Sequence, residues 1–191
     1  MANIAIAYHS GFGHTRRQAE AVQSGAASVA GATAKLYAVD TLDEAQWAEL
    51  DAADAIVFGS PTYMGSASAK FKAFMDESSK RWYGRAWKDK VAAGFTTSAS
   101  QSGDKLNTLM QLMVFANQHG MIWVGVDLLP GNNNSKGSVD DLNRLGSFSG
   151  AMAQANGDQG AEAMLESDLK TAAHLGARVA TTAQRFLRGS L

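Results

Sequence analysis

The feature that most constrains this chain is a series of short apolar runs, each about as long as one β-strand. Four of them are continuously apolar: Ile4–Tyr8, Ala55–Gly59, Val91–Phe95 and Met121–Val126. Continuous apolar runs without alternation are typical of strands in a parallel sheet that is covered on both faces. A weaker fifth run, Thr33–Val39, alternates between apolar and polar residues and therefore suits an edge strand.

Helical patterns lie between these runs and after the last one. Each set of apolar residues at helical spacing marks one face of a helix. The sets are Ala19, Val22 and Ala26; Phe71, Phe74 and Met75; Leu106, Leu109, Met110 and Met113; and Leu165, Leu169, Ala172, Leu175 and Val179, with a weaker pattern at 44–50. Five strands alternating with helices predict an α/β fold, a doubly wound three-layer sandwich, with residues 1–191 as one domain.

Composition excludes several classes of function. The 17 basic and 18 acidic residues leave a net charge of -1, which provides no basic field for nucleic acid. Because there is no cysteine, disulfides, thiolate metal sites and a cysteine nucleophile are excluded, and redox chemistry needs a bound cofactor. The histidines lack metal-ligand spacing, so we assign no metal site. With no signal-peptide pattern and no apolar run of about 18 residues, we expect a cytoplasmic protein without a membrane partner.

The loop after the first strand has the pattern of an anion site. It reads HSGFGHT and leads directly into a helical pattern, so its amide groups meet the positive end of a helix dipole. Ser10 and Thr15 add hydroxyl groups, while Gly11 and Gly13 permit a close approach of the backbone. The structural alternative is a simple turn in which Thr15 and Gln18 form a capping box.

Two other phosphate motifs fail at this loop. A triphosphate-binding loop needs a lysine after its last glycine, and none is present. A dinucleotide-binding loop needs a third glycine where this chain has Arg16. Asp40, at the end of the second strand, is the one residue that suits a dinucleotide, and an acid there is more often a turn residue. The loop therefore favours another phosphate ligand.

Two further loops follow the third and fourth strands. GSPTYMG contains Pro61, which fixes the backbone, a hydroxyl on Thr62, and an apolar surface from Tyr63 and Met64. TTSASQSGDK, which begins at Thr96, is rich in hydroxyl and small residues and can approach a flat polar ring with its backbone. Since the carboxyl ends of parallel strands lie at one edge of the sheet, we expect the three loops to share one ligand.

A long segment without periodicity, 127–160, follows the last predicted strand. A loop of this length inside a compact domain is usually functional or disordered. We expect it to emerge at the carboxyl edge of the sheet. There Phe148 and Met152 would form a wall of the binding site or complete it across a subunit interface.

Together these loops resemble one family. YHSGFGHT, GSPTYMG, DESSKRW, TTSASQSGD and NQHGM occur in the order and approximate spacing of the flavodoxin-like quinone oxidoreductases called the WrbA family. The resemblance covers nearly the whole chain. It implies a flavodoxin-like sandwich with a five-stranded parallel sheet in the order 2-1-3-4-5. It also implies FMN as cofactor, NADH or NADPH as donor, a quinone as acceptor in a ping-pong cycle, and a homo-oligomer, either a dimer or a tetramer.

The resemblance also implies roles for individual residues. The FMN-binding set is Ser10, Gly11, Phe12, Gly13, His14, Thr15, Pro61, Thr62, Tyr63, Met64, Gly65, Thr97, Ser98, Ala99, Ser100, Gln101, Ser102 and His119. His119 would reach the flavin of a neighbouring subunit, and Phe12 and Trp82 would contact the substrates. No side chain is assigned as a catalytic nucleophile, because the flavin carries the chemistry.

Some positions depart from the family pattern, and other functions stay open. Tyr63 stands where the family commonly has a basic residue, which leaves the choice between NADH and NADPH undecided. His119 could instead serve the negative end of a helix dipole, and Trp82 could be a packing aromatic. The functional alternatives are a flavodoxin-type electron carrier and an FMN-dependent flavin, azo or nitro reductase. Carriers are usually strongly acidic, which the net charge of -1 does not match.

Overall fold

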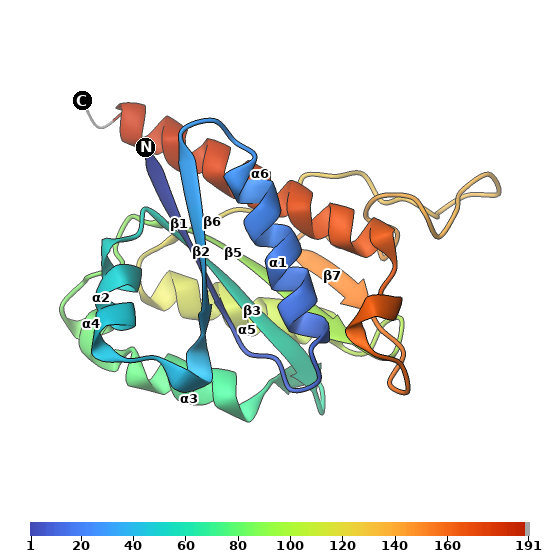
Figure 1. Cartoon of the computed structure of the whole chain (residues 1–191), viewed down its shortest axis with the longest axis horizontal. Coiled ribbons are helices and arrows are strands. Elements are labelled where there is room, and N and C mark those ends of the chain that lie inside the picture. The colour runs from blue at the N-terminus through green and yellow to red at the C-terminus, as the bar shows by residue number, and fades with distance from the viewer. Residues whose placement is uncertain (190–191) are drawn as a thin grey trace.

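The computed structural model describes residues 1–189 as a parallel β-sheet enclosed by helices (Figure 1). Five strands lie across the sheet in the order β2-β1-β3-β5-β6, and each neighbouring pair is parallel. Their bounds are Ala32–Ala38 (β2), Ala2–Tyr8 (β1), Ala55–Tyr63 (β3), Val91–Ser98 (β5) and Ile122–Trp123 (β6). The predicted parallel sheet and its order are confirmed.

Burial along the strands follows the apolar patterns. The central strands β1, β3 and β5 are buried at nearly every position, whereas in β2 only Tyr37 is fully buried, as expected for an edge strand. Pairing continues to the carboxyl ends, where Tyr8 lies beside Gly59 and Pro61 lies beside Thr97. The loops after β1, β3 and β5 therefore leave the sheet side by side.

The fifth position of the sheet is split between two segments, which the sequence did not predict. β6 pairs only with the first two residues of β5. The chain then leaves the sheet and returns as β7, Ala151–Gln154, which pairs in parallel with Phe95–Ser98 of β5. With the two-residue β4, Ser66–Ala67, antiparallel to β3, the sheet has seven strands rather than five. The segment predicted as one long loop thus contributes to the sheet.

The helices cover both faces of the sheet, as predicted for a three-layer sandwich (Figure 1). Their bounds are His14–Ala27 (α1), Glu44–Ala52 (α2), Ala69–Glu77 (α3), Ser79–Tyr83 (α4), Lys105–Gln118 (α5) and Glu166–Gly189 (α6), with 3₁₀ turns at Val39–Thr41 and Ala161–Ala163. α1 and α6 pack together on one face. A Cβ atom on Gly25 of α1 would overlap the backbone of α6, so these helices meet at backbone contact.

The other face holds α2, α3 and α5 over an aromatic core. Trp47 and Phe74 stack with ring centroids 5.1 Å apart, and Phe58 and Phe115 meet edge to face at 5.2 Å. Trp87 is fully buried among them. Buried aromatic side chains are large contributors to core energy, so this face anchors the sheet from below the loops.

The predicted buried face of α5 is partly wrong. Leu109 is buried as expected, but Leu106 and Met110 are exposed. Lys105 and Thr108 are fully buried in their place. The helix is therefore rotated so that two polar side chains face inward, towards the loop region, and an apolar stripe faces outward.

Candidate functional site

Residues from all three predicted loops line one cavity at the carboxyl edge of the sheet. Its volume is about 240 Å³. The lining residues are Phe12, His14 and Thr15 from the first loop, Pro61, Thr62 and Tyr63 from the second, Thr97, Ser98 and Ala99 from the third, and Ala155 and Gly157 from the segment after β7. The expected convergence of the loops is confirmed.

The first loop turns directly into α1 and leaves amide groups free. Gly13 is the helix N-cap with φ of 92°, a left-handed conformation that glycine adopts without strain. Ser10 Oγ accepts the amide protons of Gly13 and Arg16, each at 3.1 Å. Within residues 1–189, no group accepts the amide protons of His14 or Thr15. Free amides at the positive end of a helix dipole form an anion site.

The capping box of Thr15 and Gln18, the structural alternative to an anion site, is not formed. Thr15 lies inside the helix rather than before it, and its side chain does not cap the helix. Gln18 is fully buried instead, where its Oε1 accepts the Thr97 hydroxyl proton at 2.6 Å and its Nε2 donates to the Ala151 carbonyl at 3.3 Å. Gln18 therefore joins α1 to the third loop and to β7.

The second loop gives the cavity an aromatic wall. The Tyr63 hydroxyl lies against Gly11, and burial raises the pKa of Tyr63. The Tyr63 ring meets the Phe12 ring edge to face, with centroids 6.3 Å apart. Met64 is fully exposed with φ of 48°, a conformation that few non-glycine residues adopt. Phe12 and Tyr63 thus place apolar surface beside the anion site.

The Thr62 hydroxyl, expected to face a ligand, is already used inside the protein. It forms hydrogen bonds of 2.8 Å with the hydroxyls of both Thr96 and Thr108. Thr62 is 8% exposed and contributes to the wall of the cavity. Its main role is therefore to join β3, β5 and α5 through a buried hydroxyl cluster.

The third loop is shaped by a buried lysine that the sequence did not single out. Lys105 Nζ donates hydrogen bonds of 2.8 Å to Ser98 Oγ and to the carbonyls of Ser100 and Gln101. The Lys105 residue is 0% exposed, and burial lowers its pKa to about 8. Ser100, Gln101 and Ser102 do not line the cavity, unlike Ser98.

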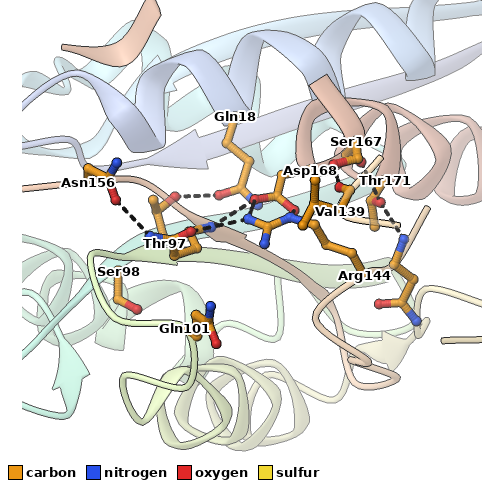
Figure 2. Close-up of polar contacts among 12 residues, drawn as sticks. Gln18, Thr97, Ser98, Gln101, Val139, Arg144, Asn156, Ser167, Asp168 and Thr171 are labelled. Atoms are coloured by element: carbon orange, nitrogen blue, oxygen red, sulfur yellow. Dashed lines mark hydrogen bonds and ion pairs between the residues drawn. The ribbon is translucent and has the colours of Figure 1, made fainter. Parts of the chain in front are cut away.

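A buried ion pair lies behind this loop (Figure 2). Arg144 binds Asp168 with both ends of its guanidinium, Nε to Oδ1 at 2.9 Å and Nη2 to Oδ2 at 2.7 Å. Their side chains are 4% and 2% exposed. Asp168 also accepts the Gln154 amide proton, and the Gln154 side chain donates to the Ala99 carbonyl at 2.9 Å. The ion pair is thus linked to the third loop through one residue of β7.

Comparisons with known proteins agree with this geometry. The family described as NADPH-dependent FMN reductase matches residues 43–133. Flavodoxin FldP of Pseudomonas aeruginosa is 43% identical over 189 residues, covering 97% of this chain and 99% of that protein. The crystal structure of a flavodoxin, WrbA-like protein from Agrobacterium tumefaciens is 45% identical, with a TM-score of 0.75, covering 97% of this chain and 99% of that protein. The chain belongs to the WrbA-like flavodoxin-fold family.

Other relatives of this WrbA-like protein carry an enzyme name. A protein of Geobacter sulfurreducens named NAD(P)H dehydrogenase (quinone) is 34% identical over 205 residues, covering 96% of this chain and 98% of that protein. A flavodoxin from the domain Archaea, 19% identical with a TM-score of 0.67, supports the fold alone. The family resemblance inferred from the loops is confirmed.

Two predicted site residues of the WrbA-like chain lie away from the three loops. Trp82, 47% exposed, and His119, 3% exposed, line a second cavity of about 640 Å³ between α3, α4 and α5. The His119 ring packs against Trp87 with centroids 4.4 Å apart, and burial lowers its pKa to about 4. Ser78 Oγ donates to the Met75 carbonyl, so it accepts from His119 Nε2 at 2.9 Å. The contact of His119 with the flavin of a neighbouring subunit and the contact of Trp82 with a substrate stay predictions.

Sequence reasoning missed several residues at the site. Ala155 and Gly157 line the cavity, whereas Phe148 and Met152, which were expected to do so, do not. Nothing in the sequence separates these small residues from an ordinary loop. Lys105 did carry a signal, because a cation in the first turn of a helix opposes the helix dipole. The position of Lys105 therefore suggests that another interaction offsets its unfavourable interaction with the helix dipole.

Residues 1–189 contain neither a cluster of metal ligands nor a membrane-spanning helix. No group of three or more histidine, aspartate or glutamate side chains in this range is placed to hold a metal ion. No helix in the same range is long and apolar enough to cross a membrane.

Proposed function

We propose that this WrbA-like protein binds FMN and transfers two electrons from NADH or NADPH to a quinone. The observation that carries the proposal is the single cavity that joins a helix N-terminus, an aromatic wall and a polar loop. These are the features that a phosphate, a flat ring system and its polar edge require. The relatives named NAD(P)H dehydrogenase (quinone) support the reaction.

The groups present fit FMN. The amides of His14 and Thr15 and the Thr15 hydroxyl suit a phosphate monoester at the start of α1. Phe12 and Tyr63 provide aromatic surface for a flavin ring beside it. Ser98 and Ala99 form the polar side of the same cavity. FMN needs all three kinds of contact at one place, and the chain provides them.

In the proposed reaction, NAD(P)H, one proton and a quinone give NAD(P)⁺ and a hydroquinone, so two electrons and two protons reach the quinone. FMN, when bound, supplies the hydride-accepting chemistry that the cysteine-free chain lacks. The residues of the chain bind and orient the reactants. Phe12, 79% exposed at the cavity, is placed to contact the nicotinamide and then the quinone, which fits a ping-pong order at one face.

We further propose that the protein works as a homo-oligomer, a dimer or a tetramer, in the cytoplasm. Trp82 and His119 are separated from the three loops within one chain, so a contribution to the flavin site requires a second subunit. An exposed apolar stripe on α5 lies beside the cavity that Trp82 and His119 line. It consists of Leu106, Met110 and Val114. A sizing measurement tests the oligomeric state, and a monomer at micromolar concentration contradicts it.

A flavodoxin-type electron carrier is the second candidate, and the similarity to flavodoxin FldP favours it. The net charge of -1 opposes it, because carriers usually dock on basic partners through an acidic surface. The deciding experiment adds FMN, NADH or NADPH and benzoquinone to the purified chain and follows nicotinamide oxidation. Rapid oxidation supports the enzyme. Binding of FMN without nicotinamide oxidation supports the carrier, and absence of FMN binding refutes both.

The phosphate position is tested at Thr15. Replacement by valine keeps the volume and removes one hydrogen bond to a charged group, so FMN should bind roughly 10- to 100-fold more weakly, since such bonds contribute about 1.5–3 kcal/mol. Replacement by glutamate should abolish binding through repulsion. Ser24→Glu, on the exposed part of the same helix, is the control and should bind FMN normally. Unchanged FMN affinity in both Thr15 variants would place the phosphate elsewhere.

A further inference from the structure

The Lys105 side chain forms hydrogen bonds with the third loop that the formation of α5 does not require. Its ammonium group donates to three acceptors of that loop, all at 2.8 Å, and the residue is fully buried. Burial of an ammonium group is costly unless it is paired and hydrogen-bonded. A buried lysine in this position therefore needs a reason beyond the packing of α5.

The lysine sets the direction of the loop's amide groups. In a planar trans peptide, the carbonyl and the next amide N–H point in opposite directions. The carbonyls of Ser100 and Gln101 point to Lys105, so the amides of Gln101 and Ser102 point away from it. The Ala99 carbonyl is held by the Gln154 side chain in the same way. Side chains thus hold three successive carbonyls of the third loop, which fixes the orientation of the three following amides.

The lysine also belongs to a buried set of charges. The charged groups that act on it are Asp168 of α6, which raises its pKa, and Arg144 of the 127–150 segment, which lowers it. Arg144 and Asp168 neutralise each other through their bidentate contact. When Lys105 is protonated, this set carries a net charge of +1. Ser98, which accepts a hydrogen bond from that ammonium group, lines the cavity.

We propose that Lys105 is a positioning residue whose buried charge, which the mutually neutralised Arg144–Asp168 pair leaves uncompensated, raises the two-electron reduction potential of FMN in this protein. The inference rests on the proposed function, because it requires FMN in the cavity. Uptake of two electrons and one proton adds one negative charge to the flavin. The Lys105 ammonium group is hydrogen-bonded to Ser98, which lines the cavity. Its positive charge stabilises the reduced flavin, since electrostatic effects are strong where water is excluded.

Two substitutions that change the buried charge in opposite directions separate an effect of charge from an effect of altered structure. Lys105→Met removes a positive charge and should lower the potential, whereas Asp168→Asn removes a negative charge and should raise it. We expect a change of roughly tenfold in the equilibrium constant for each, which for a two-electron couple is about 30 mV. Lys105→Gln retains hydrogen-bond donors without the charge and should lower the potential as Lys105→Met does. Lys136→Met, an exposed lysine of the 127–150 segment, is the control and should leave it unchanged.

The measurement is a spectroscopic redox titration of the FMN-loaded protein at pH 7, with a known reference dye and with FMN binding measured first. A second readout is the pH dependence. Because burial lowers the pKa of Lys105 to about 8, the difference in reduction potential between wild type and Lys105→Met should narrow towards pH 9.5. Shifts of opposite sign for the Lys105 and Asp168 variants support the inference. If the variants bind FMN but their reduction potentials are unchanged, or shift in the same direction, the inference is overturned. Failure of the wild-type chain to bind FMN overturns the proposed function as well.

Discussion

Replacement of Asp168 by asparagine should destabilise the protein by about 3–5 kcal/mol, because it leaves a buried guanidinium without its counter-ion. The carboxylate accepts three hydrogen bonds, two from Arg144 and one from the Gln154 amide, at 2.7–2.9 Å. Asparagine keeps the shape but provides one acceptor oxygen and no charge. The Asp168 charge also raises the pKa of Lys105, so its removal makes that buried ammonium group more costly as well.

The assay is urea unfolding at pH 7 followed by circular dichroism, with the slope compared between variants to check that the denatured state is unchanged. For a chain of 191 residues, a loss of about 3–5 kcal/mol corresponds to a fall in melting temperature of roughly 6–20 °C. Glu20→Gln is the matched control. Its partner Arg16 and Glu20 itself are 66% and 45% exposed, so the loss of that ion pair should cost less than about 1 kcal/mol.

A double variant tests the reason for the effect. Arg144→Met combined with Asp168→Leu removes both charges, and such replacements of buried ion pairs are often neutral or stabilising. The double variant should therefore recover most of the stability lost in Asp168→Asn. If Asp168→Asn costs less than about 1 kcal/mol, the pair is not buried in solution and does not stabilise the fold in this way.

Two other predictions concern single residues. Gly103 has φ of 55°, and a Cβ atom there would overlap Ser98 Oγ, so Gly103→Ala should cost roughly 1–3 kcal/mol in urea unfolding and should weaken FMN binding by displacing the third loop. The pKa of His119 is lowered to about 4 by burial, below the value of about 6.5 expected in the unfolded chain. The unfolded chain thus binds more protons between these values, so stability should fall as the pH drops from 6.5 to 4. His119→Gln should flatten this dependence in urea titrations, and an unchanged slope would contradict it.

The parts of the fold that could be predicted are those set by local sequence. The apolar runs that form β1, β3 and β5 are continuous because these strands are covered on both faces, and they are found where expected. The first loop could be identified because glycine, a hydroxyl and the start of a helix are adjacent in sequence. β7 could not be predicted. Ala151–Gln154 is short and its pairing partner β5 lies more than fifty residues earlier.

The polar interior of the site also lay beyond sequence patterns. A pattern of apolar residues predicts which face of a helix is buried by its apolar side chains. It therefore cannot identify Thr108 and Lys105, which are polar. They are buried because partners from other segments satisfy them, the Thr62 hydroxyl for Thr108 and the loop carbonyls for Lys105. Such partners exist only after the chain has folded, so burial of these residues depends on contacts that periodicity does not contain.

The long segment between β6 and β7 also helps to hold the third loop in place. Asn143 closes its base, where its side chain binds the backbone of both Leu128 and Ser147. The next residue, Arg144, reaches Asp168 and so fixes the start of α6 against β7. Gln154 then carries this constraint to the third loop. Because the closing residue and the charged residue are adjacent, any change that opens the base of this segment also displaces the ion pair, and with it the loop that forms the polar wall of the cavity.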